Sequence, residues 1–191
     1  SNGLARFEEG KWTVYTTSSG LPNNVIRHLI ETTDNNGKKA IWVGTDGGLA
    51  RFEEEKWTVY TTSSGLPNNV IRGLSKSKSS IGHSLWVGTE GGVGHFDNGT
   101  WTIYQDKDGL ASNEVRCVLE TTSAEGEPIL WVGTGGFGLS RFEKGHWITY
   151  TTKSGLPDDS VWSLLETTST AGIRTLWIGM ASRGGLAKLE T

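Results

Sequence analysis

Residues 4–27 read LARFEEGKWTVYTTSSGLPNNVIR, and residues 49–72 repeat this stretch with one difference, Gly10 against Glu55. Looser copies begin at Val93 and Leu139. Self-similarity at a fixed spacing is typical of repeat architectures, in which each unit buries its apolar face against the next unit. The repeats therefore organise the whole chain of 191 residues.

Two columns of tryptophan set the period of the repeat at 44 to 46 residues. The first column is Trp12, Trp57, Trp101 and Trp147, and the second is Trp42, Trp86, Trp131 and Trp177. A period in the forties with about four short strands per unit is typical of β-propeller blades, and the apolar spacing of helical arrays is absent. The sequence predicts an all-β chain, a β-propeller built from four four-stranded antiparallel blades, with almost no helix.

Within the first unit we expect strands at residues 24–31, 40–44, 49–52 and 57–61. Alternate connections of an antiparallel sheet emerge at opposite ends, so the GTDGG-type loops (44–48) and the GLPNN-type loops (20–24) should share one face. The repeats divide the chain into 4–48, 49–92, 93–138 and 139–185, with a closing strand at 186–191. We interpret residues 1–191 as one propeller domain or half of a ring.

The chain opens in the middle of a blade, with a third and a fourth strand, and it ends with a first, a second and a third strand. Joining the terminal strands completes a fourth blade by a permuted closure, which hides the sheet edges. One third strand is then surplus, either the copy at residues 4–7 or the copy at residues 186–190.

Charge and composition exclude several classes of partner. The 18 basic and 21 acidic residues are well mixed and give a net charge of −3, so no basic field is available for nucleic acid. No apolar run approaches the roughly 18 residues of a membrane span, so we expect no membrane insertion of this chain. The residues four positions after each second-strand tryptophan form no continuous carboxylate column (Asp46, Glu90, Gly135 and Ala181), so no metal or other cofactor is expected.

The first strand of each unit offers the candidate ligand-binding residues. Arginine follows the GLPNN-type turn in three units, and tryptophan takes its place in the fourth: Arg27, Arg72, Arg116 and Trp162. A polar column precedes them: Asn24, Asn69, Asn113 and Asp159. The arginines could bind an anion or an acidic sugar at the channel mouth, or they could pair with carboxylates of neighbouring blades. The polar column could contact the same ligand or tie each turn to its own backbone.

Two loops are longer in the later units, at residues 133–138 and 179–185. They lie on the expected GLPNN face, and they add Phe137 and Arg183 to the candidate ligand-binding residues.

The combination of GLPNNVIR with LWVGT, GG and LxRF resembles the two-component regulator propeller repeat. The resemblance covers essentially the whole chain in four copies. It implies a propeller of the kind found in the extracytoplasmic sensor halves of bacterial hybrid two-component systems, where oligosaccharide-type signals are the usual ligands. A periplasmic or extracellular location is implied in the same way.

The resemblance also bears on the size of the ring. Seven blades are usual in that family, about 51° each, so such blades need only ~45° in an eight-bladed ring but ~90° in a four-bladed one. We therefore expect a homodimer that completes an eight-bladed ring, with the four-bladed monomer as the alternative.

The function predicted from the sequence is a non-catalytic binding or interaction module for an oligosaccharide or another acidic small molecule. Two alternatives stay open. The near-identity of neighbouring copies also suits a structural scaffold, recently duplicated or designed, without a ligand of its own. A lyase or glycosidase on a propeller scaffold would need carboxylates in unequal units, for which Glu114, Asp158 and Asp159 are candidates.

Overall fold

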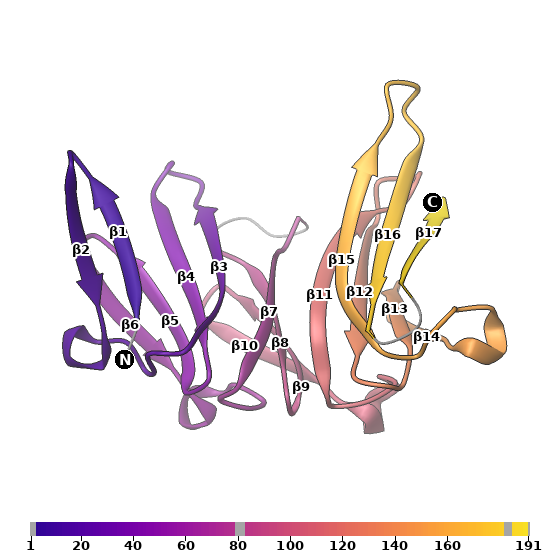
Figure 1. Cartoon of the computed structure of the whole chain (residues 1–191), viewed down its shortest axis with the longest axis horizontal. Coiled ribbons are helices and arrows are strands. Elements are labelled where there is room, and N and C mark those ends of the chain that lie inside the picture. Colours follow the sequence, from indigo (N-terminus) through magenta and orange to yellow (C-terminus); the bar gives the residue numbers. More distant parts are fainter. Residues whose placement is uncertain (1–2, 79–82, 182–184, 191) are drawn as a thin grey trace.

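The computed structural model describes residues 3–78, 83–181 and 185–190, and these residues form a curved row of antiparallel sheets (Figure 1). The helical residues in this part of the chain lie in four 3-10 turns of three residues each, Thr17–Ser19, Thr62–Ser64, Asp106–Asp108 and Thr152–Ser154. The all-β class predicted from the sequence is therefore confirmed.

Three complete four-stranded sheets, here called blades, occupy the middle of the chain. The first blade consists of β3 (Ile26–Thr33), β4 (Lys39–Thr45), β5 (Gly48–Glu53) and β6 (Lys56–Tyr60). The second consists of β7 (Ile71–Lys76), β8 (Leu85–Thr89), β9 (Gly92–Asp97) and β10 (Thr100–Tyr104). The third consists of β11 (Val115–Thr122), β12 (Pro128–Thr134), β13 (Leu139–Glu143) and β14 (His146–Tyr150). In the first blade the strand bounds lie within two residues of those expected from the sequence.

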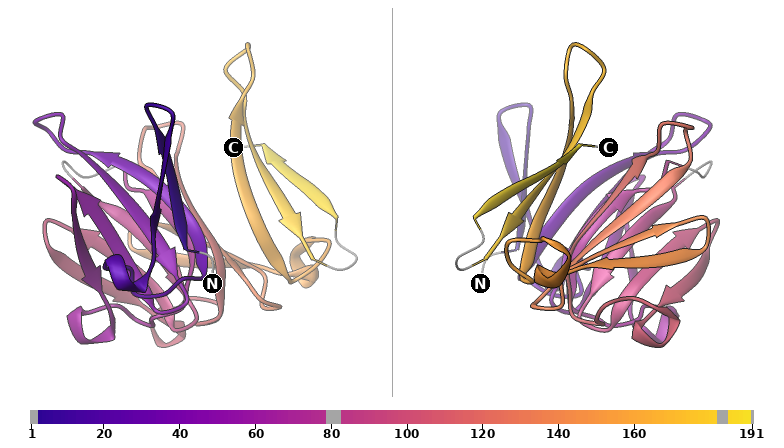
Figure 2. Two further views of the ribbon diagram at one scale, coloured as in Figure 1. Left: turned by 60° about the vertical axis from the view of Figure 1, so that its left-hand side comes forward. Right: turned by 90° about the vertical axis from the view of Figure 1, so that its right-hand side faces the viewer.

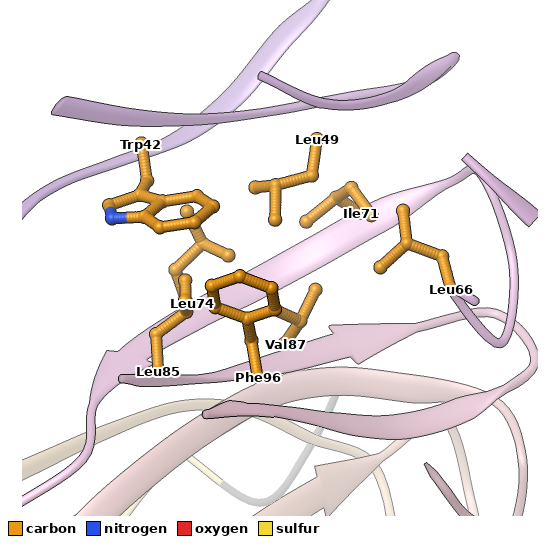
Figure 3. Close-up of a cluster of buried hydrophobic side chains, with 8 residues drawn as sticks. All are labelled: Trp42, Leu49, Leu66, Ile71, Leu74, Leu85, Val87 and Phe96. Atoms are coloured by element: carbon orange, nitrogen blue, oxygen red, sulfur yellow. The ribbon is translucent and has the colours of Figure 1, made fainter. Parts of the chain in front are cut away.

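The core consists of apolar layers between successive blades. In the layer shown in Figure 3, Trp42 and Leu49 of the first blade meet Leu74, Leu85 and Phe96 of the second. Burying a tryptophan removes about 150–250 Å² from water, which is worth roughly 4–6 kcal/mol as an upper bound. The same layer recurs around Trp86 and around Trp131, so these second-strand tryptophans hold the blades together.

The two kinds of loop expected on one face do contact each other. The amide of Asp46 donates a hydrogen bond to the carbonyl of Val25 at 3.3 Å, and the amide of Glu90 does the same to Val70. Glycine is required at this contact, because a Cβ on Gly47 would lie 2.8 Å from the carbonyl oxygen of Pro22. The loops that flank the first strands therefore gather at one end of the sheets.

The two ends of the chain form incomplete sheets. At the N-terminal end β1 (Leu4–Glu8) pairs only with β2 (Lys11–Tyr15), and at the C-terminal end β15 (Val161–Thr168), β16 (Arg174–Met180) and β17 (Leu186–Glu190) form a three-stranded sheet. Both copies of the third strand are thus formed, β1 on β2 and β17 on β16. The permuted closure is not made within this single chain, because the two terminal sheets lie at opposite ends of the row (Figure 1).

Candidate ligand-binding surface on the inner strands

The first strands of successive sheets lie next to one another, with β3 against β7, β7 against β11 and β11 against β15. They therefore form the inner edge of the curved row. The columns of candidate residues predicted from the sequence lie at the start of these strands, near the end of the sheets where the two kinds of loop meet.

The first two arginines are neutralised by carboxylates of their own blade. Arg27 donates two hydrogen bonds to Asp46, from Nε to Oδ1 at 2.8 Å and from Nη2 to Oδ2 at 2.7 Å. Arg72 pairs with Glu90 through a single oxygen, Oε1, which accepts from Nε at 3.0 Å and from Nη2. The hydrogen bond from Arg27 lowers the pKa of the Asp46 carboxyl below its usual value. These ion pairs are the alternative to anion binding that the sequence left open.

In the third unit, glycine takes the place of the carboxylate. A Cβ on Gly135 would lie 2.9 Å from Nε of Arg116, so the absent side chain leaves the space that the guanidinium occupies. Arg116 instead pairs with Glu114, and its Nη1 lies 3.9 Å from Oε1 of Glu90 in the preceding blade. The guanidinium of Arg116 therefore lies between carboxylates of the second and third units.

Arg116 also covers the aromatic residue of the fourth unit. Its guanidinium carbon lies 5.2 Å from the centroid of the Trp162 ring, within the range of a cation–π contact. Trp162 is 53% exposed, and its indole Nε1 donates to Oγ of Ser160 at 3.0 Å. The structure thus brings two predicted site residues together, with about half of the Trp162 side chain open to solvent.

The lengthened loop of the third unit lies beside this pair. Its amide at Gly138 donates to the carbonyl of Asp159 at 2.7 Å, and Gly135 forms an isolated bridge with Ser160. Phe137 in this loop is 55% exposed. Arg183, the candidate from the other lengthened loop, lies outside the described residues.

The polar column is engaged with its own turns. Asn24 accepts a hydrogen bond from the amide of Thr17 at 2.9 Å, and the equivalent acceptors make the same bond in the other units: Asn69 to Thr62, Asn113 to Asp106 and Asp159 to Thr152. Each bond ties the 3-10 turn to the start of the next first strand. Their side-chain oxygens therefore stabilise the turns that position the arginines and Trp162.

The carboxylates considered for catalysis are also committed to local structure. Oδ1 of Asp158 accepts from the amide of Ser160 at 2.8 Å, and Oδ1 of Asp159 accepts from the amide of Thr152 at 2.6 Å. Glu114 pairs with Arg116. Within the described residues, no group of three or more His, Cys, Asp or Glu side chains is arranged to hold a metal ion.

A polar cavity of about 490 Å³ lies away from this surface, between the first and second blades. His83 lines it, with Nδ1 2.7 Å from Oγ1 of Thr32 and Nε2 3.0 Å from Oε1 of Glu53. The repeat pattern did not predict this contact because His83 occurs in one unit only. For Glu90 the signal was present, since it occupies the position equivalent to Asp46.

Solved structures share this arrangement of sheets. The extracellular domain of the hybrid two component system BT3049 from B. thetaiotaomicron matches 92% of this chain with a TM-score of 0.72 and 23% identity. The extracellular domain of the hybrid two component system BT4673 from the same organism matches 98% with a TM-score of 0.73 and 21% identity. The chain therefore shares its fold with these extracellular domains of hybrid two-component systems, as the sequence resemblance implied.

This chain spans about a quarter of the length of those structures, 23% of the first and 27% of the second. No protein-family model matches the sequence, and no curated protein matches it. The described part of the chain contains no helix that is long and apolar enough to cross a membrane.

Proposed function

We propose that this chain is a non-catalytic, sensor-type recognition module that binds an oligosaccharide at the surface formed by Arg116 and Trp162. The observation that carries the proposal is the exposed Trp162 ring beneath the Arg116 guanidinium. Exposed aromatic faces flanked by planar hydrogen-bonding groups suit the apolar faces and hydroxyls of sugar rings. The likeness to extracellular domains of two-component systems supports a sensor role and a periplasmic or extracellular location.

The charges on the inner strands favour a neutral sugar over an acidic one. Arg27, Arg72 and Arg116 each lie beside a carboxylate. An acidic ligand would have to compete with these carboxylates for the guanidinium groups, whereas hydroxyl groups can bond to the pairs without breaking them.

The experiment is a screen of neutral and acidic oligosaccharides by the ligand-induced shift in melting temperature, followed by calorimetric titration of each hit. The decisive variant is Trp162→Arg, which gives the fourth unit the residue that the other three units carry at this position. This change preserves the repeat pattern, so we expect an unchanged fold and at least tenfold weaker binding. Arg116→Ala should weaken binding as well.

Arg27→Ala is the matched control, because Arg27 occupies the same column but pairs only with Asp46 within its blade. It should leave the affinity unchanged. If no sugar in the panel binds, or if a sugar binds equally well to Trp162→Arg, the proposed recognition surface is wrong.

We also propose that the ring is completed by a second copy of the chain, since both terminal sheets expose edges and apolar faces that the interior blades bury. Trp12 is 69% exposed and Leu186 is 66% exposed, whereas their repeat equivalents Trp57 and Leu139 are half-buried and buried, respectively. A mass of twice 20.7 kDa in light scattering at micromolar concentration would support this proposal, and a mass of 20.7 kDa would refute it.

A further inference from the structure

Each of the two contacts between the three complete blades uses two tryptophans. In the first contact, Trp42 of one blade fits among Leu74, Leu85 and Phe96 of the next, with its ring 5.4 Å from that of Phe96 (Figure 3). A fourth-strand tryptophan of the next blade also covers a turn glycine, because a Cβ on Gly65 would lie 2.8 Å from the Trp101 ring. Gly20 meets Trp57 and Gly109 meets Trp147 in the same manner.

The N-terminal end of the chain has the three apolar residues that surround a second-strand tryptophan in the interior contacts, but it lacks that tryptophan. Leu29, Ile41 and Phe52 are the repeat equivalents of Leu74, Leu85 and Phe96, and we call them the Leu29 socket. They line an apolar cavity of about 180 Å³. Leu29 is 49% exposed, whereas Leu74 is 4% exposed. Tyr15 of β2 already packs on Phe52 at 5.4 Å, as Tyr60 packs on Phe96 at 5.3 Å.

The C-terminal end offers the matching tryptophan without a socket. Trp177 is held by a hydrogen bond from Nε1 to Oγ1 of Thr167 at 2.8 Å, the bond that Trp42 makes to Thr32 at 2.9 Å. It is therefore already oriented as the buried tryptophans are. Around it lies an apolar surface with Leu165 59% exposed and Leu186 66% exposed.

The contact between a turn glycine and a fourth-strand tryptophan is also incomplete at both ends. Here the glycine lies at the C-terminal end and the tryptophan at the N-terminal end. Gly155 is the repeat equivalent of Gly20, Gly65 and Gly109, yet a Cβ built on it would meet nothing within 4 Å. Together with Tyr150, Leu156 and Ile178 it lines a cavity of about 140 Å³, which we call the Gly155 socket. The missing tryptophan is Trp12, which is 69% exposed at the other end of the chain.

We infer that these surfaces are two halves of one interface between copies, in which Trp177 of one copy fills the Leu29 socket of the other while Trp12 of that copy fills the Gly155 socket of the first. This inference rests on the self-association proposed above, and it names the residues that make it. Two such seams, related by a two-fold axis, close two chains into one ring.

The same interface decides which of the two third strands is displaced. Phe7 on β1 is 60% exposed and packs against Trp12 at 4.9 Å, as Phe52 packs against Trp57 at 4.7 Å. β17 carries Leu189 at that position. Placing the β1–β2 hairpin of the second copy on β16 keeps the hairpin intact and buries Phe7. β17 therefore gives way to β1 of the partner.

A second copy suits this interface better than the chain's own ends. The contacts between successive sheets hold them in a row whose terminal sheets lie apart (Figure 2). Closing one chain on itself would change the angle between the packed sheets, whereas pairing with a second copy leaves the packing within each chain as it is.

The test begins with light scattering on purified chain at micromolar concentration, where the wild type should have twice the chain mass of 20.7 kDa. Trp12→Ala and Leu29→Glu should each give monomers with the circular dichroism spectrum of the folded protein, because Trp12 is largely exposed and Leu29 about half exposed in the single chain. Trp177→Ala should do the same from the other end. Ile173→Ala is the matched control, an exposed apolar residue on the tip of the β15–β16 hairpin outside both sockets, and it should remain dimeric.

Mixing variants tests the polarity of the seam. The Leu29→Glu chain keeps Trp177 unchanged, and the Trp177→Ala chain keeps the Leu29 socket unchanged. Their mixture can therefore form one intact seam. We expect the mixture to form heterodimers with a dissociation constant at least tenfold lower than either variant forms with itself.

The outcomes separate this inference from the proposal on which it rests. A wild-type monomer would refute both. A wild-type dimer that survives Trp12→Ala, Leu29→Glu and Trp177→Ala would leave the dimer standing and refute these surfaces. A mixture that associates no better than its components would refute the head-to-tail polarity.

Discussion

Asp46 accepts two hydrogen bonds from Arg27, and in the first three units the residue four positions after the second-strand tryptophan decides how the inner arginine is held. The pairing lowers the pKa of the Asp46 carboxyl, with the hydrogen bond from Arg27 as the largest cause. A carboxyl with a lowered pKa in the folded state stabilises the fold above its ordinary pKa of about 4, and this stability is lost as pH falls through the lowered value.

Asp46→Asn should therefore lower the melting temperature at neutral pH, by an amount that shrinks as pH falls below about 4. Because both side chains are partly exposed, the effect should lie within the roughly 0.2–1 kcal/mol range of surface ion pairs. Melting curves of both proteins between pH 7 and pH 2 measure the difference. A difference that stays constant over this range would contradict the assignment.

Glu55→Gly should stabilise the protein. The hairpin turns between third and fourth strands have positive φ at both central residues, and Glu55 (φ 59°) stands where the other turns have Gly10, Gly99 and Gly145. A left-handed conformation costs a residue with a Cβ about 1–2 kcal/mol, so after loss of the exposed Arg6–Glu55 ion pair we expect a net gain of about 0.5–1 kcal/mol.

Denaturant unfolding measures this gain, and Glu55→Ala is its control. Alanine removes the same ion pair but keeps the Cβ, so it should not stabilise the protein. If glycine and alanine have equal effects, backbone strain at this turn is not the cause.

Thr121→Val should lower the free energy of unfolding more than Thr167→Val does. Both substitutions remove a hydroxyl that accepts a hydrogen bond from a second-strand tryptophan. The bond from Trp131 to Thr121 is buried, and valine would leave the indole N–H without a partner at a cost of about 1–3 kcal/mol. The bond from Trp177 to Thr167 is exposed in the single chain, where water can replace the hydroxyl.

This comparison is best made by denaturant unfolding in a Trp12→Ala background, which keeps the chain monomeric if the proposed seam is right. Equal losses in the two variants would show that Trp177 is as well buried as Trp131, contrary to the structure of the single chain.

Cys117 should be inert to thiol reagents in the folded protein. Burial raises the pKa of its thiol to about 12, which leaves roughly a thousandfold less thiolate at pH 8 than an unperturbed cysteine has. The rate of reaction with a chromogenic disulfide should be slow in buffer and fast in concentrated urea. Equal rates in the two solvents would contradict the raised pKa of this thiol.

Removing residues 186–191 should strengthen self-association. If β1 of a second copy takes the place of β17, the full chain must first break the pairing between β16 and β17, and the shortened chain avoids this cost. A lower dissociation constant by analytical ultracentrifugation would support the exchange. Weaker association of the shortened chain would instead make β17 part of the seam.

The sequence predicted the architecture well because an inference made for one unit can be checked against the other copies of the repeat. The strands of one unit, the shared face of the GLPNN and GTDGG loops and the burial of Trp42, Trp86 and Trp131 all follow from alternation and turn chemistry, which are local properties. The site was predicted less completely. Arg116 and Trp162 were candidates as members of one column, but their contact depends on Gly135 in a different strand connection.

By itself, the sequence determined the blades, their order and the incomplete sheets at both ends, because hydrogen-bonded strands and tight turns are specified by residues close together in the chain. Only the tertiary structure decided which arginines are neutralised, that Trp162 lies under Arg116, and that Trp12 and Trp177 lack the partners that their equivalents have. Those features depend on packing between units, where side chains far apart in the sequence meet, and a column of identical residues cannot reveal which of its members is left without a neighbour.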